Sequence, residues 1–139
     1  MQELKASKEI TVRFNEVDSM NIVWHGSYSL YFEDARTAFG EQYGLGYLDI
    51  FSHGYYAPLV DLSFSYKHPL FFGNKARVDI IFQNTETAKL VFHYAIHLLD
   101  DERLVATGKS TQVFLDKDYQ LVWSNLPFYE AWKRKYHLI

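Results

Sequence analysis

The stretch "SYSLYFEDARTAFGEQYG", residues 27–44, decides the predicted fold, because the apolar period of the chain becomes helical there. Ser27 suits the N-cap position of a helix, and Gly44 suits its C-terminal end. The residues expected on one side of this helix are mostly aromatic: Tyr28, Tyr31, Phe32, Ala35, Phe39 and Tyr43. A helix of this span is about 25 Å long. So many aromatic side chains predict that other elements wrap around the helix.

The segments around this helix alternate between apolar and polar side chains, as strands do. The predicted strands are Ile10–Phe14, Val60–Tyr66, Val78–Phe82, Leu90–Leu98 and Leu104–Leu115. Short turns between the last four favour antiparallel pairing. Leu45–Ala57 is expected to be irregular, and a tail helix is expected over about 126–136, with Pro127 in its first turn. The predicted class is α+β, with an antiparallel sheet curling around the long helix.

Length and composition set the broad class of protein. The chain has 139 residues, so we expect one domain, 1–139, with its core at about 8–116. A net charge of −3 gives no reason to expect a nucleic-acid partner. There is no cysteine, the N-terminal segment is polar, and no segment approaches the roughly 20 apolar residues that span a bilayer. We therefore expect a soluble, cytoplasmic protein without a membrane span.

The loop "DSMNIVWHG", Asp18–Gly26, places a carboxylate just before the start of the predicted helix. The first backbone N–H groups of a helix lack internal partners and carry partial positive charge, so they can polarise a carbonyl. Gly26 would let a substrate come close, and Asp18 would attack the carbonyl or activate a water. On spacing alone the alternative is an ordinary connecting loop, in which Asp18 is a capping or solvated residue and His25 is a capping or packing residue.

A longer stretch, "VRFNEVDSMNIVWHGSYSLYFEDART" at 12–37, resembles the N-terminal signature of the 4-hydroxybenzoyl-CoA thioesterase family. The matching places are Phe14, Glu16, Asp18, Ile22-Val23-Trp24, His25, Tyr28, Glu33, Ala35 and Arg36. Looser similarity continues through "SFSYKHPLFFGNKARV" (63–78) and "ATGKSTQVFLD" (106–116), so it covers about residues 8–116. One departure is the Ser19-Met20-Asn21 segment, where the family often has glycine.

The resemblance implies a hot-dog fold, an antiparallel sheet around a long helix, and hydrolysis of acyl-CoA thioesters to the free acid and CoA. Asp18 would be the catalytic nucleophile or general base. The backbone N–H of His25, with Gly26 nearby, would polarise the thioester, and the His25 side chain would contact the carbonyl or orient water. The alternatives are hydrolysis of acyl carrier protein thioesters and a non-catalytic acyl-CoA-binding module. A homodimer or homotetramer is also implied.

Further substrate contacts are expected at Trp24 and Tyr28, which flank the helix start, and at two charged residues. Glu33 can hydrogen-bond near the site, or it can pair with Arg36 one turn later, which contributes only ~0.2–0.5 kcal/mol. Lys89 opens a strand where family members place cations near the CoA phosphates, and the alternative is a solvated turn lysine. Lys67 and His68, next to Pro69, have the same two interpretations. His93 and His97 share a strand face, but no third ligand completes a metal pattern. No metal and no cofactor apart from the CoA of the substrate are expected.

Overall fold

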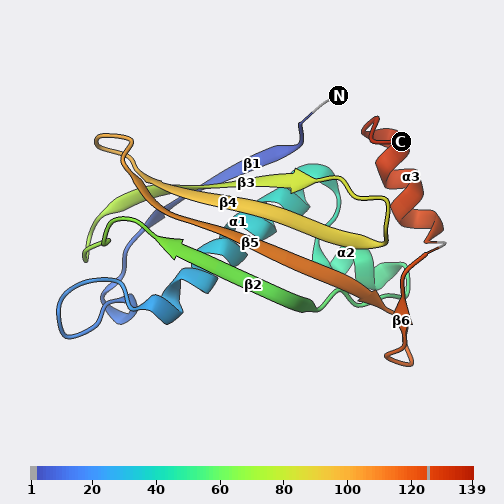
Figure 1. Cartoon of the computed structure of the whole chain (residues 1–139), viewed down its shortest axis with the longest axis horizontal. Helices are drawn as coiled ribbons and strands as arrows, with labels where there is room; N and C mark the ends of the chain where they lie inside the picture. Colours follow the sequence, from blue (N-terminus) through green and yellow to red (C-terminus); the bar gives the residue numbers. More distant parts are fainter. Residues whose placement is uncertain (1–2, 125) are drawn as a thin grey trace.

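A computed structural model describes residues 3–124 and 126–139 of the chain (Figure 1). The strands are β1 (Lys5–Thr11), β2 (Leu59–Tyr66), β3 (Lys75–Gln83), β4 (Lys89–Leu98), β5 (Leu104–Leu115) and β6 (Leu121–Val122). The α-helices are α1 (Tyr28–Tyr43), α2 (Tyr47–Ser52) and α3 (Pro127–Lys135). Two 3₁₀ turns, Phe14–Glu16 and His25–Ser27, lie between β1 and α1.

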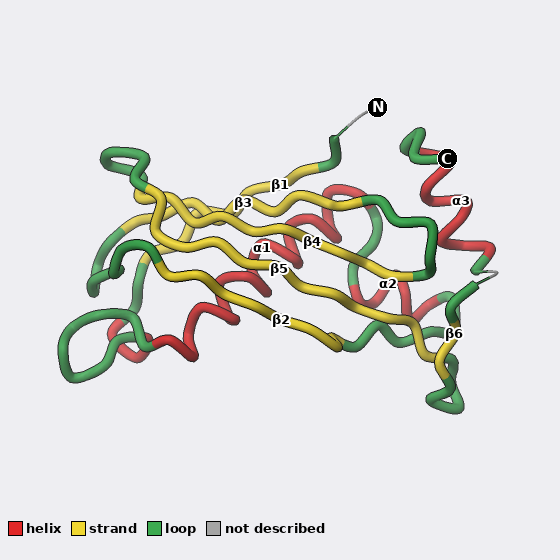
Figure 2. Tube along the Cα trace, viewed as in Figure 1, coloured by secondary structure: helices red, strands yellow, loops and turns green. Residues whose placement is uncertain are grey.

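The sheet has the order β1-β3-β4-β5-β2, with every pair antiparallel, and β6 extends it by pairing with β5. Its strands curve around α1, which crosses one face obliquely (Figures 1 and 2). This arrangement confirms the predicted α+β class and the hot-dog fold. In the described part of the chain, we find no helix that is both long enough and apolar enough to span a membrane.

The core lies between α1 and the inner face of the sheet, where the predicted aromatic side chains of the helix are buried, except for Tyr43, which is partly buried. Phe32 stacks on Tyr94 of β4, with ring centroids 4.3 Å apart. Gly108 of β5 makes room for the same ring, because a Cβ atom there would come within 2.2 Å of Phe32 Cε2 and 2.8 Å of the Ser63 carbonyl oxygen. Gly44 ends α1 in the left-handed conformation, at a φ of 70°, as predicted.

Three element predictions differ from the structure. β1 ends at Thr11, and Phe14 lies in a 3₁₀ turn with 76% of its surface exposed, because the chain must turn there to enter α1. Leu45–Ala57 is not wholly irregular, since it contains the short helix α2. The two-residue strand β6 was not predicted at all.

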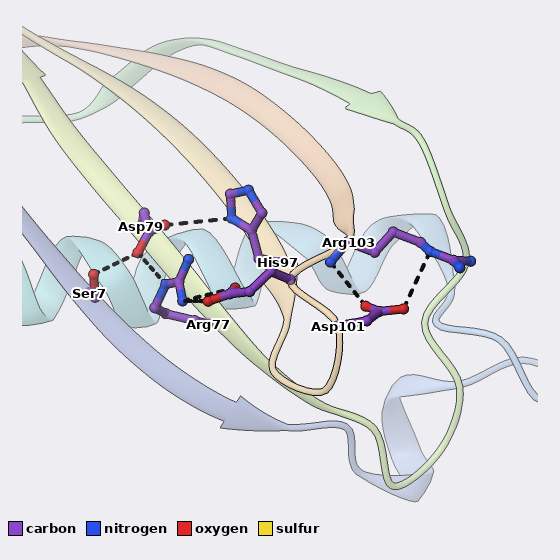
Figure 3. A network of polar contacts seen from close by, with 7 residues as sticks. Ser7, Arg77, Asp79, His97, Asp101 and Arg103 are labelled. Carbon is purple, nitrogen blue, oxygen red and sulfur yellow. Dashed lines mark hydrogen bonds and ion pairs between the residues drawn. The ribbon is translucent and has the colours of Figure 1, made fainter.

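The outer face of the sheet carries a polar network that lies apart from the helix (Figure 3). The Asp79 carboxylate accepts hydrogen bonds from the Ser7 hydroxyl at 2.6 Å and from Arg77 Nε at 2.9 Å. His97 Nδ1 lies 3.6 Å from the same carboxylate, and Arg77 also contacts Glu102. This network joins β1, β3, β4 and the turn that follows β4.

Candidate functional site

The loop after β1 is held in a tight turn by Asp18 itself. The Asp18 N–H donates to the Ile22 carbonyl at 2.8 Å, and Asp18 Oδ1 accepts a hydrogen bond from the Met20 N–H at 2.8 Å. Asn21 takes the left-handed conformation, at a φ of 64°. Asparagine tolerates this conformation better than most residues. Asn21 therefore supplies the left-handed conformation in this turn, which a glycine could also adopt.

Glu16 fastens both ends of this loop. Its buried carboxylate accepts hydrogen bonds from the Arg13 N–H at 2.7 Å and from the Tyr31 hydroxyl at 3.0 Å. Its carbonyl accepts the Trp24 N–H and the Ser27 hydroxyl. Ser27 therefore stands at the N-cap position of α1, as predicted, but its side chain bonds to the loop instead of capping the helix. Burial, followed by the hydrogen bond to Glu16, raises the pKa of Tyr31.

A second loop, residues 67–71, lies against the first. The Val23 N–H donates to the Leu70 carbonyl at 2.8 Å, and Ile22 forms an isolated β-bridge with Phe71. At the end of β2, the Tyr66 hydroxyl donates to the His25 carbonyl at 3.2 Å. These bonds bring the segment after β2 to the start of α1.

Between the two loops lies an open cavity of about 510 Å³. Its lining residues are Asp18, Met20, Ile22, Val23, His25, Tyr28, Tyr66, Lys67, His68 and Pro69. Asp18, His25 and Tyr28, three of the residues predicted for the site, thus face one space. The Arg103 guanidinium lies 3.4 Å from the His68 ring nitrogens and adds positive charge near that rim.

Trp24 and Gly26 contribute to the site in a different way. The indole ring of Trp24 lies against Gly26, where an added Cβ atom would come within 2.1 Å of Trp24 Cζ3. Gly26 therefore gives space to this ring. Trp24 does not line the cavity, and about half of its surface is exposed.

Glu33 and Lys89 are not brought to this cavity. The Glu33 carboxylate lies 3.4 Å from the Tyr47 hydroxyl, and its expected partner Arg36 is buried, bonding Gln112 and the Leu45 carbonyl. Burial lowers the pKa of Arg36. Lys89 starts β4 and pairs with Val113, whereas the cavity lies at the opposite end of the strand, near Ile96 and Ala106. Within one chain, neither residue contacts the Asp18 cavity.

Tyr66, Lys67 and His68 are residues of the cavity that the sequence did not assign to it. Tyr66 was predicted only as an apolar strand position, whereas Lys67 and His68, next to Pro69, were interpreted like Lys89, as contacts of the CoA phosphates or as solvated residues. Their position depends on the bonds between two loops more than 40 residues apart in sequence, such as Tyr66 with His25. The only sequence feature that could have indicated them is a tyrosine followed by two basic residues, Tyr66-Lys67-His68, at the end of a predicted strand.

The site combines a carboxylate, the positive end of a helix and an open space between them. The 3₁₀ turn His25–Ser27 runs directly into α1, so the first N–H groups, at His25 and Gly26, lack helical acceptors. Such groups bind developing negative charge. Among the described residues, no three His, Asp or Glu side chains are arranged to hold a metal ion.

An antiparallel sheet wrapped around one long helix, with a cavity at the helix start that Asp18 and His25 both line, is the arrangement expected of hot-dog thioester hydrolases. The thioesterase-like superfamily matches residues 12–128 of the chain. The chain therefore belongs to the thioesterase-like superfamily.

Individual relatives agree with this assignment. YneP of Bacillus subtilis, provisionally named an acyl-CoA thioesterase, is 35% identical over 113 residues, covering 81% of each chain. A chloroplastic acyl-acyl carrier protein thioesterase of Arabidopsis thaliana is 26% identical over 114 residues, covering 82% of this chain and 60% of the relative. The crystal structure of a DHNA-CoA thioesterase from Staphylococcus aureus superposes with a TM-score of 0.84 at 25% identity, covering 96% and 91% of the two chains.

Proposed function

We propose that this enzyme hydrolyses acyl-CoA thioesters in the cavity between Asp18 and the start of α1. The observation that carries the proposal is that Asp18 and His25 line one cavity at the positive end of the long helix. The names of YneP and of the Staphylococcus aureus enzyme favour CoA as the group that carries the acyl chain. The reaction needs no cofactor besides the CoA of the substrate.

In the proposed reaction, the thioester carbonyl oxygen lies against the N–H groups of His25 and Gly26. These groups stabilise the negative charge that develops as the carbonyl carbon becomes tetrahedral. With Asp18 as general base, the oxygen of water bonds to that carbon while Asp18 takes the proton. The C–S bond then breaks, and the proton passes to the CoA sulfur, giving the free acid and the thiol.

A nucleophilic Asp18 is the other form of the same proposal. The carboxylate would then displace CoA to form a mixed anhydride, which water hydrolyses afterwards. A single turnover in water labelled with heavy oxygen distinguishes the two. Label found in the Asp18 carboxylate after digestion identifies the nucleophile, whereas label confined to the released acid favours the base.

Lys67 and His68 are better placed than Lys89 to contact the charged part of a substrate. Both line the cavity that holds Asp18, and Arg103 lies beside His68. Cationic side chains bind phosphate oxygens through charge-assisted hydrogen bonds. We therefore assign the CoA phosphates to this rim.

A second copy of the chain is proposed to pair along β2. This strand is at one edge of the sheet path, and Leu59 and Val60 on it are exposed. An exposed edge strand offers unpaired backbone groups to another chain. A homodimer, or a homotetramer built from two such dimers, is expected by light scattering, and a monomer at all working concentrations would contradict it.

The function is tested by measuring free thiol release from a panel of short, long and aromatic acyl-CoAs. The same acyl group on acyl carrier protein tests the alternative, which the Arabidopsis relative supports. A higher kcat/KM on the CoA thioester supports the proposal, and a higher value on the carrier protein favours the alternative. Tight acyl-CoA binding without thiol release would instead identify a binding module.

A further inference from the structure

The Tyr66 hydroxyl lies at the start of α1 but comes from β2. It donates a hydrogen bond to the His25 carbonyl oxygen at 3.2 Å. That carbonyl belongs to the peptide unit whose N–H is carried by Gly26. Tyr66 is therefore bonded directly to the backbone between the two N–H groups proposed to receive the thioester oxygen.

This part of the backbone benefits from a support outside the helix. Gly26 has no side chain, so rotation about its backbone bonds is restricted less than at other residues. The neighbouring bonds fix the chain before and after it: Trp24 N–H donates to the Glu16 carbonyl, and the Ser29 hydroxyl donates to the Gly26 carbonyl. The bond from Tyr66 fixes the peptide between them.

The tyrosine ring is itself held in place by two other rings. The Tyr28 ring meets it edge-on, with centroids 5.0 Å apart, and the Phe64 ring stacks parallel to it at 6.0 Å. Tyr28 belongs to the first turn of α1 and Phe64 to β2. The hydroxyl is thus carried by the sheet, and contacts with one ring of α1 and one ring of β2 help to direct it to the helix start.

We propose that Tyr66 is a positioning residue, which holds the His25–Gly26 peptide so that the N–H groups at the start of α1 point to the thioester carbonyl. This inference rests on the function proposed above. Tyr66 need not touch the reacting atoms to act in this way. A misplaced donor costs transition-state stabilisation, because such donors are effective only when they are already oriented.

The test is Tyr66→Phe, which removes the hydroxyl and keeps the ring. One hydrogen bond of this kind predicts a loss in kcat of about three- to tenfold, with KM little changed. Tyr119→Phe is the matched control, because Tyr119 stacks on Tyr56 and is no part of the cavity lining. We expect the control to keep the wild-type kcat.

A spectroscopic measurement separates orientation of the donors from a general structural effect. An acyl-CoA with a carbon-13 carbonyl is bound to Asp18→Asn, with and without Tyr66→Phe, and its carbonyl stretch is followed by infrared difference spectroscopy. We expect the downward shift of the band to be smaller without the hydroxyl. An unchanged band, an unchanged kcat, or a loss confined to KM would overturn the role of Tyr66. Absence of thiol release by the wild-type enzyme from every thioester would instead overturn the proposed function, and this inference with it.

Discussion

Single residues give the Asp18 loop its shape. Asp18 closes its own turn, Asn21 supplies the left-handed conformation, and Glu16 joins the loop to α1. The sequence indicated Asp18, His25 and Tyr28 as site residues, and all three line the cavity. It did not indicate what Glu16 bonds, because the partners of a buried carboxylate depend on which donors the fold brings near it.

Replacing Glu16 tests this support of the loop. Glu16→Ala leaves the Arg13 N–H and the Tyr31 hydroxyl without their acceptor. An unsatisfied buried polar group costs about 1–3 kcal/mol, and we expect the free energy of unfolding to fall by about that amount. Urea unfolding measures it, with Glu9→Ala, an exposed position on β1, as control. Equal stability of the two variants would show that Glu16 does not hold the loop.

The helices and strands of the core follow from local pattern, and the shorter elements do not. The burial of Tyr31, Phe32 and Phe39 on α1 was predicted from their helical spacing. This spacing can be recognised because α1 is sixteen residues long. By contrast, α2 has only six residues, too few to show a period, and β6 has two. Phe14 continued the alternation of β1 in sequence, yet the chain leaves the sheet before it.

The contact between α1 and β5 predicts a severe effect of Gly108→Ala. The new methyl group would meet the Phe32 ring at 2.2 Å and the Ser63 carbonyl at 2.8 Å. The carbonyl belongs to the neighbouring strand, so it cannot move without disturbing the β2–β5 pairing. Overpacking of a core typically costs about 1–3 kcal/mol, and we expect a loss in the upper part of this range.

Thermal and urea unfolding of Gly108→Ala give this loss. Thr107→Ala, one residue earlier on β5 and on the outer face of the sheet, is the matched control. If Gly108→Ala were as stable as that control, the close packing of Phe32 on β5 would be wrong.

At the scale of the whole molecule, the sequence predicted a sheet wrapped around a helix but not the contacts that complete the cavity. The order of the segments with strand-like and helix-like spacing of apolar residues was enough to predict the fold class. The pairing of Val23 with Leu70, and of Tyr66 with His25, joins segments far apart in sequence. The spacing of apolar residues along the chain does not predict such contacts, because they depend on the curvature and register of the sheet.

The buried tyrosines make stability depend on alkaline pH. Burial raises the pKa of Tyr94 to about 12 from its ordinary value of 10.0, and it also raises that of Tyr28 and Tyr129. Between about pH 10 and about pH 12, the unfolded chain loses phenolic protons that the folded chain keeps. The free energy of unfolding should therefore fall as pH rises through this range.

Urea unfolding at about pH 8, 10 and 11 measures the effect, with Tyr94→Phe as the variant. The variant is expected to lose less stability than the wild type across this range, because it has one raised tyrosine fewer. If both lost the same amount, Tyr94 would not contribute to the alkaline transition.

The central claim is that the negative charge of Asp18, opposite the start of α1, drives thioester hydrolysis. The most direct measurement is kcat of Asp18→Asn, since an asparagine oxygen can still accept the Met20 N–H and preserve the turn. Asp116→Asn is the control, because Asp116 Oδ1 makes the same kind of turn with the N–H groups of Asp118 and Gln120. We predict a loss of about 10²–10⁴ in kcat for Asp18→Asn and wild-type turnover for Asp116→Asn. Turnover of Asp18→Asn close to that of the wild type would contradict the claim.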